Sequence, residues 1–162
     1  MSKREDIPWS KREIWTILFV FVVSMALATY MLLVKSWVYV AAYWAIWMLF
    51  FFLGRFMICR HCDYLTRPCP TLCMGILAGK LFARSNKKDF TEIRTWTFYL
   101  DVAFIVAAMI FPLIVYGYFI FREGLTRTEW FLVAVYLVVG ITAQAIHSRS
   151  CKKCAAGGCP LR

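Results

Sequence analysis

Acidic residues are scarce in this sequence, and charge of either sign is missing from four long stretches. The chain has 162 residues, with 9 Asp and Glu against 19 Lys and Arg, and a formal net charge of +10. No charged residue occurs in 14–34, 37–53, 102–121 or 130–146. A helix needs roughly 20 mainly apolar residues to cross a bilayer. The uncharged stretches therefore predict a membrane protein, and the sparse charge within them argues against an ion pathway.

Familiar catalytic and nucleotide-binding motifs are absent as well. The sequence contains no Walker loop, dinucleotide fingerprint, hydrolase elbow or histidine metal box. Nothing in it resembles a nucleic-acid-reading module, so we expect no nucleic acid among its partners. The expected partners are the lipid bilayer and either other membrane or redox subunits or further copies of the chain. A chain this small is expected to be a non-catalytic redox or anchor subunit more readily than a free-standing enzyme.

What is present is apolar sequence: 62% of the residues are hydrophobic and 18% are aromatic. The pattern predicts an all-α integral membrane protein with one four-helix transmembrane domain over 1–162. The spans are expected at about 14–34, 37–56, 97–121 and 130–147, as two helical hairpins. An alternative for the first span, a cleaved signal peptide, fits poorly because the apolar run exceeds the usual 7–15 residues.

Local signals place the helix ends. The pairs Ser10/Glu13, Asp89/Glu92 and Thr126/Glu129 have capping-box spacing, which predicts helix starts near residues 11, 90 and 127. Between the second and third spans, residues 71–82 predict a short amphipathic helix on the cytoplasmic surface. Its Gly75-x3-Gly79 motif permits close approach of another helix.

The basic residues are distributed unequally between the two predicted sides of the membrane. If the termini share a side, 16 of the 19 Lys and Arg lie there, and Lys35, Arg122 and Arg127 lie opposite. The positive-inside rule then places both termini in the cytoplasm. We expect a prokaryotic inner (plasma) membrane location.

All 7 cysteines fall on this cytoplasmic side, in two segments. The segment 59–73 carries Cys59, Cys62, Cys69 and Cys73, and the segment 151–159 carries Cys151, Cys154 and Cys159. The cytosol keeps thiols reduced, so metal binding or thiol redox chemistry is expected rather than structural disulfides. Each segment opens with a C-x2-C turn, and a four-helix bundle can bring two such turns together. All seven cysteines are predicted metal ligands, and His61 and His147 are candidate additional ligands.

The spacing leaves the identity of the metal open. Neither segment has the ferredoxin spacing, although both share its opening C-x2-C and a Cys-Pro pair. Zinc accepts looser spacing and needs four ligands. An iron–sulfur electron-transfer or anchor subunit, with a quinone as membrane partner, is the leading interpretation. A zinc-stapled scaffold or assembly factor, a quinone-linked thiol oxidoreductase and lipid-modified cysteines are the alternatives.

Two polar residues lie within the predicted spans. Asp101 is expected to pair with Arg94 or Arg55, or else to serve a proton or a quinone headgroup. Gln144 is expected to hydrogen-bond between helices.

Overall fold

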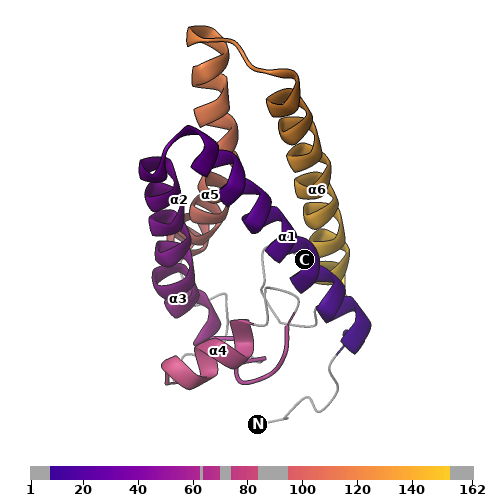
Figure 1. Cartoon of the computed structure of the whole chain (residues 1–162). Helices are drawn as coiled ribbons and strands as arrows, with labels where there is room; N and C mark the ends of the chain where they lie inside the picture. Colours follow the sequence, from indigo (N-terminus) through magenta and orange to yellow (C-terminus); the bar gives the residue numbers. More distant parts are fainter. Residues whose placement is uncertain (1–7, 63, 70–73, 84–94, 154–162) are drawn as a thin grey trace.

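A computed structural model describes residues 8–62, 64–69, 74–83 and 95–153 of the chain. Those residues form helices and loops without any strand, which confirms the all-α prediction. In chain order the elements are α1 (Lys11–Lys35), α2 (Trp37–Leu49), the π-helical turn η1 (Phe50–Gly54), α3 (Arg55–Cys59), α4 (Met74–Leu81), α5 (Thr95–Arg122) and α6 (Arg127–Lys152). In Figure 1, α4 lies at the lower end, below α3.

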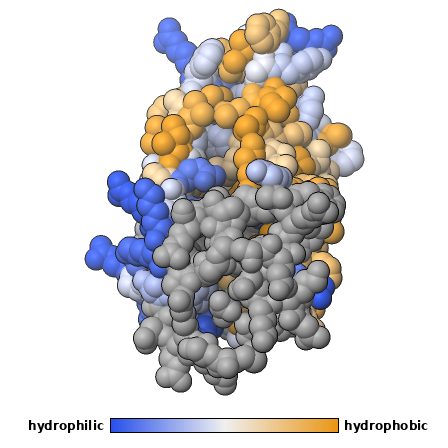
Figure 2. All heavy atoms as spheres, turned by 180° about the vertical axis from the view of Figure 1, so that it is seen from behind, coloured by the Kyte–Doolittle hydropathy of each residue, from blue (hydrophilic) through white to orange (hydrophobic). Residues whose placement is uncertain are grey.

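Three helices, α1, α5 and α6, are long and apolar enough to cross a membrane, and Trp37–Leu53 is a shorter apolar helix. Large apolar side chains cover their outer surfaces; Phe121, for example, is 91% exposed. In Figure 2, hydrophobic residues form most of the surface above the grey residues, and strongly hydrophilic residues gather at the top and at the left. Water-soluble proteins rarely expose apolar surface so extensively. These helices indicate an integral membrane protein.

The predicted helix starts are confirmed where the structure describes them. Ser10 caps α1 and Thr126 caps α6, each through a complete capping box with the glutamate three residues on. The third predicted start, near residue 90, lies outside the described residues. Side chains that satisfy the exposed first-turn N–H groups fix where a helix begins, so this signal is local and readable from sequence.

The turn between α1 and α2 consists of the single extended residue Ser36. Its N–H donates to the Leu32 carbonyl oxygen at 2.9 Å, and its hydroxyl accepts from the Val38 N–H at 3.3 Å. One residue therefore ends α1 and caps α2.

Helix packing does not follow the two hairpins. The most extensive interhelical contacts join α1 to α6 and α2 to α5. In Figure 1, α1 runs obliquely from the side of α6 to the side of α2. The core between the helices is formed by Phe21, Ala28, Met31, Leu32, Tyr43, Trp47, Phe50, Ala108, Val115, Tyr116, Tyr136 and Ala143, with partly buried neighbours around them.

Buried tyrosines in this core hydrogen-bond to helix carbonyls. The Tyr116 hydroxyl donates to the Met31 carbonyl oxygen at 2.9 Å, and the Tyr136 hydroxyl donates to the Met109 carbonyl oxygen at 2.8 Å. A buried hydroxyl without such a partner would be costly in an apolar environment. These bonds join α5 to α1 and α6 to α5.

An ion pair joins α1 and α6 at the upper end in Figure 1, where α1 ends and α6 begins. Lys35 Nζ lies 2.5 Å from Glu129 Oε1, and both side chains are 11% exposed. The same ammonium lies 4.6 Å from the centre of the Phe119 ring. The pair is largely shielded from water. The attraction between its charges is therefore stronger than it would be at an open surface.

Candidate metal centre

The first cysteine segment begins where α3 ends at the lower end of the bundle. Cys59 is the last residue of α3 and is buried, and Cys62 and Cys69 are partly buried. Successive turns continue the chain past the helix: the Cys62 N–H donates to the Cys59 carbonyl oxygen, and the Leu65 N–H donates to that of Cys62, each at 3.1 Å. The segment is therefore compactly folded over the described residues.

Two glycines of α4 allow this loop to pack on the helix. A Cβ atom at Gly75 would lie 2.3 Å from the Arg67 carbonyl oxygen, and one at Gly79 would lie 2.6 Å from Thr66 Cγ2. The Thr66 N–H also donates to the Gly75 carbonyl oxygen at 2.8 Å. The Gly75-x3-Gly79 motif thus admits the backbone of the cysteine loop, where the sequence predicted another helix.

The same contact gives Cys69 a hydrogen bond. The Gly75 N–H donates to Cys69 Sγ at 3.3 Å. Backbone N–H groups that donate to sulfur are a recurring feature of cysteine-ligated metal sites, where they tune the electron density on the ligand. The loop and α4 therefore support Cys69 as a candidate ligand.

The second cysteine segment begins within the last turn of α6. Cys151 Sγ lies 3.4 Å from Nε2 of His147, one turn earlier on the same helix. The His147 ring meets Phe21 of α1 edge-on, with ring centres 6.2 Å apart at 87°. The side chains of His147 and Cys151 are both partly buried. The structure thus places one cysteine and one predicted histidine ligand side by side.

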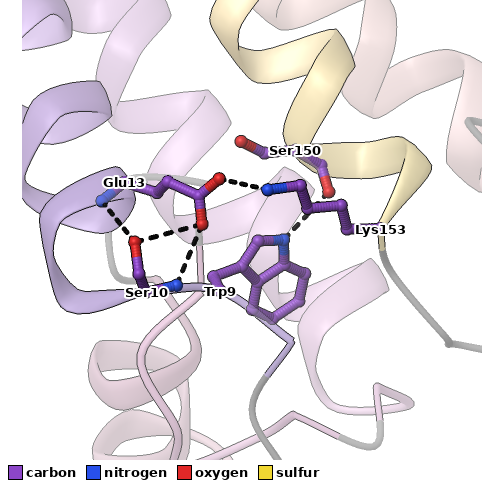
Figure 3. A network of polar contacts seen from close by, with 5 residues as sticks. All are labelled: Trp9, Ser10, Glu13, Ser150 and Lys153. Atoms are coloured by element: carbon purple, nitrogen blue, oxygen red, sulfur yellow. Dashed lines mark hydrogen bonds and ion pairs between the residues drawn. The ribbon is translucent and has the colours of Figure 1, made fainter.

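Trp9, just before α1, contacts residues next to cysteines of both segments; Figure 3 shows its contact with Ser150. Its indole N–H donates to the Ser150 carbonyl oxygen at 2.9 Å, directly before Cys151. Its ring packs against Tyr64 with centres 5.0 Å apart, two residues after Cys62. Trp9 is 6% exposed. One side chain therefore contacts the first segment and the residue that directly precedes the second.

A second contact reinforces this connection between the beginning of α1 and the end of α6. Lys153 forms an ion pair with Glu13, whose carboxylate also accepts the Ser10 N–H at 2.9 Å (Figure 3). Cys62 and Cys69 pack against the buried cluster of Trp9, Ile14 and Tyr64. We refer to Trp9, Ser10, Glu13, Ser150 and Lys153 as the N-terminal latch.

The described cysteines from both segments thus lie at the same end of the bundle. Among the described residues, however, no group of three His, Cys, Asp or Glu side chains is arranged to hold a metal ion. Three predicted ligands, Cys73, Cys154 and Cys159, lie outside those residues. His61 lies in the turn between Cys59 and Cys62 and is partly buried.

The two polar residues of the predicted spans have different environments. Asp101 is buried on α5, at 7% exposure. The side chains of Arg55 and Arg94, its predicted partners, lie outside the described part of the structure. Gln144 is exposed on α6 instead of packed between helices.

Sequence reasoning missed the latch. Tryptophan is enriched at membrane surfaces, so the sequence favours an interfacial position for Trp9 over a contact between distant segments. A residue that contacts positions 55 and 141 residues away leaves no periodic or spacing signal. The capping box at Ser10 and Glu13 was readable, but its link to Lys153 was not.

No protein-family model, curated protein or solved structure matches this chain. The function is therefore argued from the residues of this chain.

Proposed function

We propose that this protein is a small polytopic membrane protein whose two cysteine segments hold one metal centre, and that it serves as an iron–sulfur electron-transfer or anchor subunit of a membrane redox complex. The observation that carries the proposal is the convergence of the segments on Trp9, through Ser150 on one side and Tyr64 on the other. The first C-x2-C turn and Cys151, which opens the second, are far apart in sequence but lie at one end of the bundle.

The proposed topology has four crossings. Besides α1, α5 and α6, the helical path from Trp37 to Cys59 is continuous through the π turn. At 1.5 Å per residue it extends roughly 35 Å, enough to cross a hydrocarbon layer of about 30 Å. The excess of Lys and Arg at the cysteine end supports a cytoplasmic location for the cysteines and both termini.

The chemistry of the donor set supports a metal centre. Cysteine thiolates bind iron–sulfur clusters and zinc. The Gly75 N–H that donates to Cys69 Sγ and the surrounding Lys and Arg would offset the negative charge of several thiolates held close together. An iron–sulfur cluster, when bound, supplies one-electron transfer. A quinone dissolved in the bilayer is the proposed exchange partner, because the cysteine end adjoins the membrane.

Zinc is the second candidate, and the His147–Cys151 contact favours it. Mixed cysteine and histidine ligands are common in structural zinc sites. Zinc would staple the two hairpins, and the protein would then be a scaffold or assembly factor.

The deciding experiment is quantification of iron, acid-labile sulfide and zinc in protein purified anaerobically. Iron with sulfide and a visible absorbance band would support the redox subunit, whereas zinc without iron would support the scaffold. Protein that holds neither metal and takes up neither on reconstitution would refute the metal centre. Substitution of Cys62 or Cys151 by Ser should lower the metal content, and Ser148→Ala, on the exposed face of α6, is the matched control.

Topology is tested separately by thiol labelling with an impermeant maleimide. The cysteines should react in opened cells and be protected in intact ones. Labelling of intact cells would refute the proposed orientation and would favour a thiol oxidoreductase working on the oxidising side of the membrane.

A further inference from the structure

We propose that His147 and Cys151 bind a single metal ion as a chelating pair, through Nε2 and Sγ, so that the centre has mixed nitrogen and sulfur ligation. This inference rests on the proposed function and specifies its ligand set. The cation it requires is a borderline-soft transition metal, such as zinc or an iron of a cluster, because both imidazole and thiolate bind such ions.

The distance between the two donor atoms fits a shared metal. Tetrahedral zinc binds sulfur at about 2.3 Å and imidazole nitrogen at about 2.0–2.1 Å, which puts the two donor atoms roughly 3.6 Å apart. Cys151 Sγ and His147 Nε2 are 3.4 Å apart. The two donor atoms therefore need to move little to accept a metal ion between them.

The helix provides the right spacing for this pair. Residues four apart lie on one face of an α-helix. Two ligands at this spacing also chelate zinc in the helical H-E-x-x-H motif. Here α6 remains helical as far as Lys152, so both residues are carried by regular helix.

The orientation of the imidazole is supported by α1. Phe21 is buried, and its ring meets the His147 ring edge-on. A ligand whose ring is fixed by packing loses less conformational entropy when a metal binds. The contact also joins the pair to the helix that leads back to Trp9.

The position of the pair argues for a metal over an isolated thiol–imidazole dyad. A distance of 3.4 Å also suits a hydrogen bond between sulfur and nitrogen, and such a dyad can act as a nucleophile. Cys151, however, directly follows Ser150, whose carbonyl oxygen accepts the Trp9 indole N–H, and Cys62 and Cys69 pack against the cluster that contains Trp9. Further thiols are thus held at the same end of the bundle.

Histidine ligation has a consequence for either metal. In an iron–sulfur centre, replacing cysteine by histidine raises the reduction potential, which would suit exchange with a quinone. In a zinc site it completes a closed structural ligand set. Extended X-ray absorption fine structure, measured at the absorption edge of the resident metal, distinguishes an iron–sulfur centre from a zinc site.

The test uses full-length protein in detergent, stripped of metal and titrated with Co²⁺. His147→Ala should weaken Co²⁺ binding by at least about tenfold, the scale of loss when even a supporting group is removed. His147→Cys should restore binding and increase the thiolate-to-cobalt absorbance. Gln144→Ala and Ser148→Ala, at exposed positions of α6, are the matched controls and should bind Co²⁺ as the wild type does.

The same variants distinguish the failures. Co²⁺ binding unchanged in His147→Ala, or scattering from sulfur alone in the wild-type X-ray spectrum, would overturn the inference and leave the metal centre standing. The inference would also be overturned if His147→Ala slowed the alkylation of Cys151 without weakening Co²⁺ binding, since that is the behaviour of a nucleophilic dyad. Wild-type protein that binds no metal would overturn the proposed function itself. Restored binding in His147→Cys guards against a variant that fails to fold.

Discussion

Replacement of Trp9 tests whether the N-terminal latch holds the two cysteine segments together. Trp9→Phe keeps an aromatic ring against Tyr64 but removes the indole N–H that donates to the Ser150 carbonyl oxygen. That oxygen also accepts the Lys153 N–H at 3.2 Å, so the substitution leaves it one partner. The expected loss is therefore that of a typical net hydrogen bond, about 1 kcal/mol.

That loss predicts a measurable change in local opening. A cost of about 1 kcal/mol raises the population of the open form roughly fivefold. Alkylation of Cys62 and Cys69 in metal-free protein, in detergent under native conditions, should accelerate by that factor. Trp9→Ala also loses a buried aromatic side chain, and about 3–5 kcal/mol is the typical cost.

The matched control is Trp15→Phe, in the first turns of α1, where the side chain is 68% exposed. It should change the alkylation rates by less than about twofold, because it removes no buried contact. Equal rates for Trp9→Ala and Trp15→Phe would refute the view that the latch holds the first cysteine segment.

Three further predictions concern other parts of the molecule. Lys35→Met should destabilise the bundle by about 2–3 kcal/mol, a cost between those at exposed and buried ion pairs, because it leaves the Glu129 carboxylate without its ammonium partner. Unfolding measured in mixed detergent should show a smaller cost of Lys35→Met when Glu129→Gln is already present. An unchanged cost would contradict the coupling of the two charges. Gly75→Ala should cost about 1–3 kcal/mol of stability because its Cβ would overlap the Arg67 carbonyl. Gly117→Ala, whose Cβ would meet nothing within 4 Å, should be neutral or slightly stabilising. Similar unfolding midpoints for the two variants would contradict the close packing of the cysteine loop on α4. Removal of the metal by a chelator should increase the alkylation of cysteines in both segments together, as measured by mass spectrometry of the labelled peptides. A change confined to one segment would contradict a shared centre.

The sequence by itself determined the features that depend on short-range chemistry. The capping boxes at Ser10 and Thr126 predicted the first residues of α1 and α6, because a helix start is decided by hydrogen bonds within four residues. Uncharged stretches predicted the apolar helices, since hydropathy is a sum over neighbouring residues. The order of the helices then places the ends of α3 and α6 on the same side.

Only the tertiary structure decided which helices pair and what joins the cysteine segments. The principal partner of α1 is α6. The two helices are joined by the Lys35–Glu129 ion pair at one end and by the N-terminal latch at the other. Each helix is hydrophobic around much of its circumference, so no single apolar stripe identifies its neighbour. Ion pairs and hydrogen bonds between residues more than ninety positions apart arise from the complete packing of the bundle. Their partners carry no local pattern by which the sequence could have identified them.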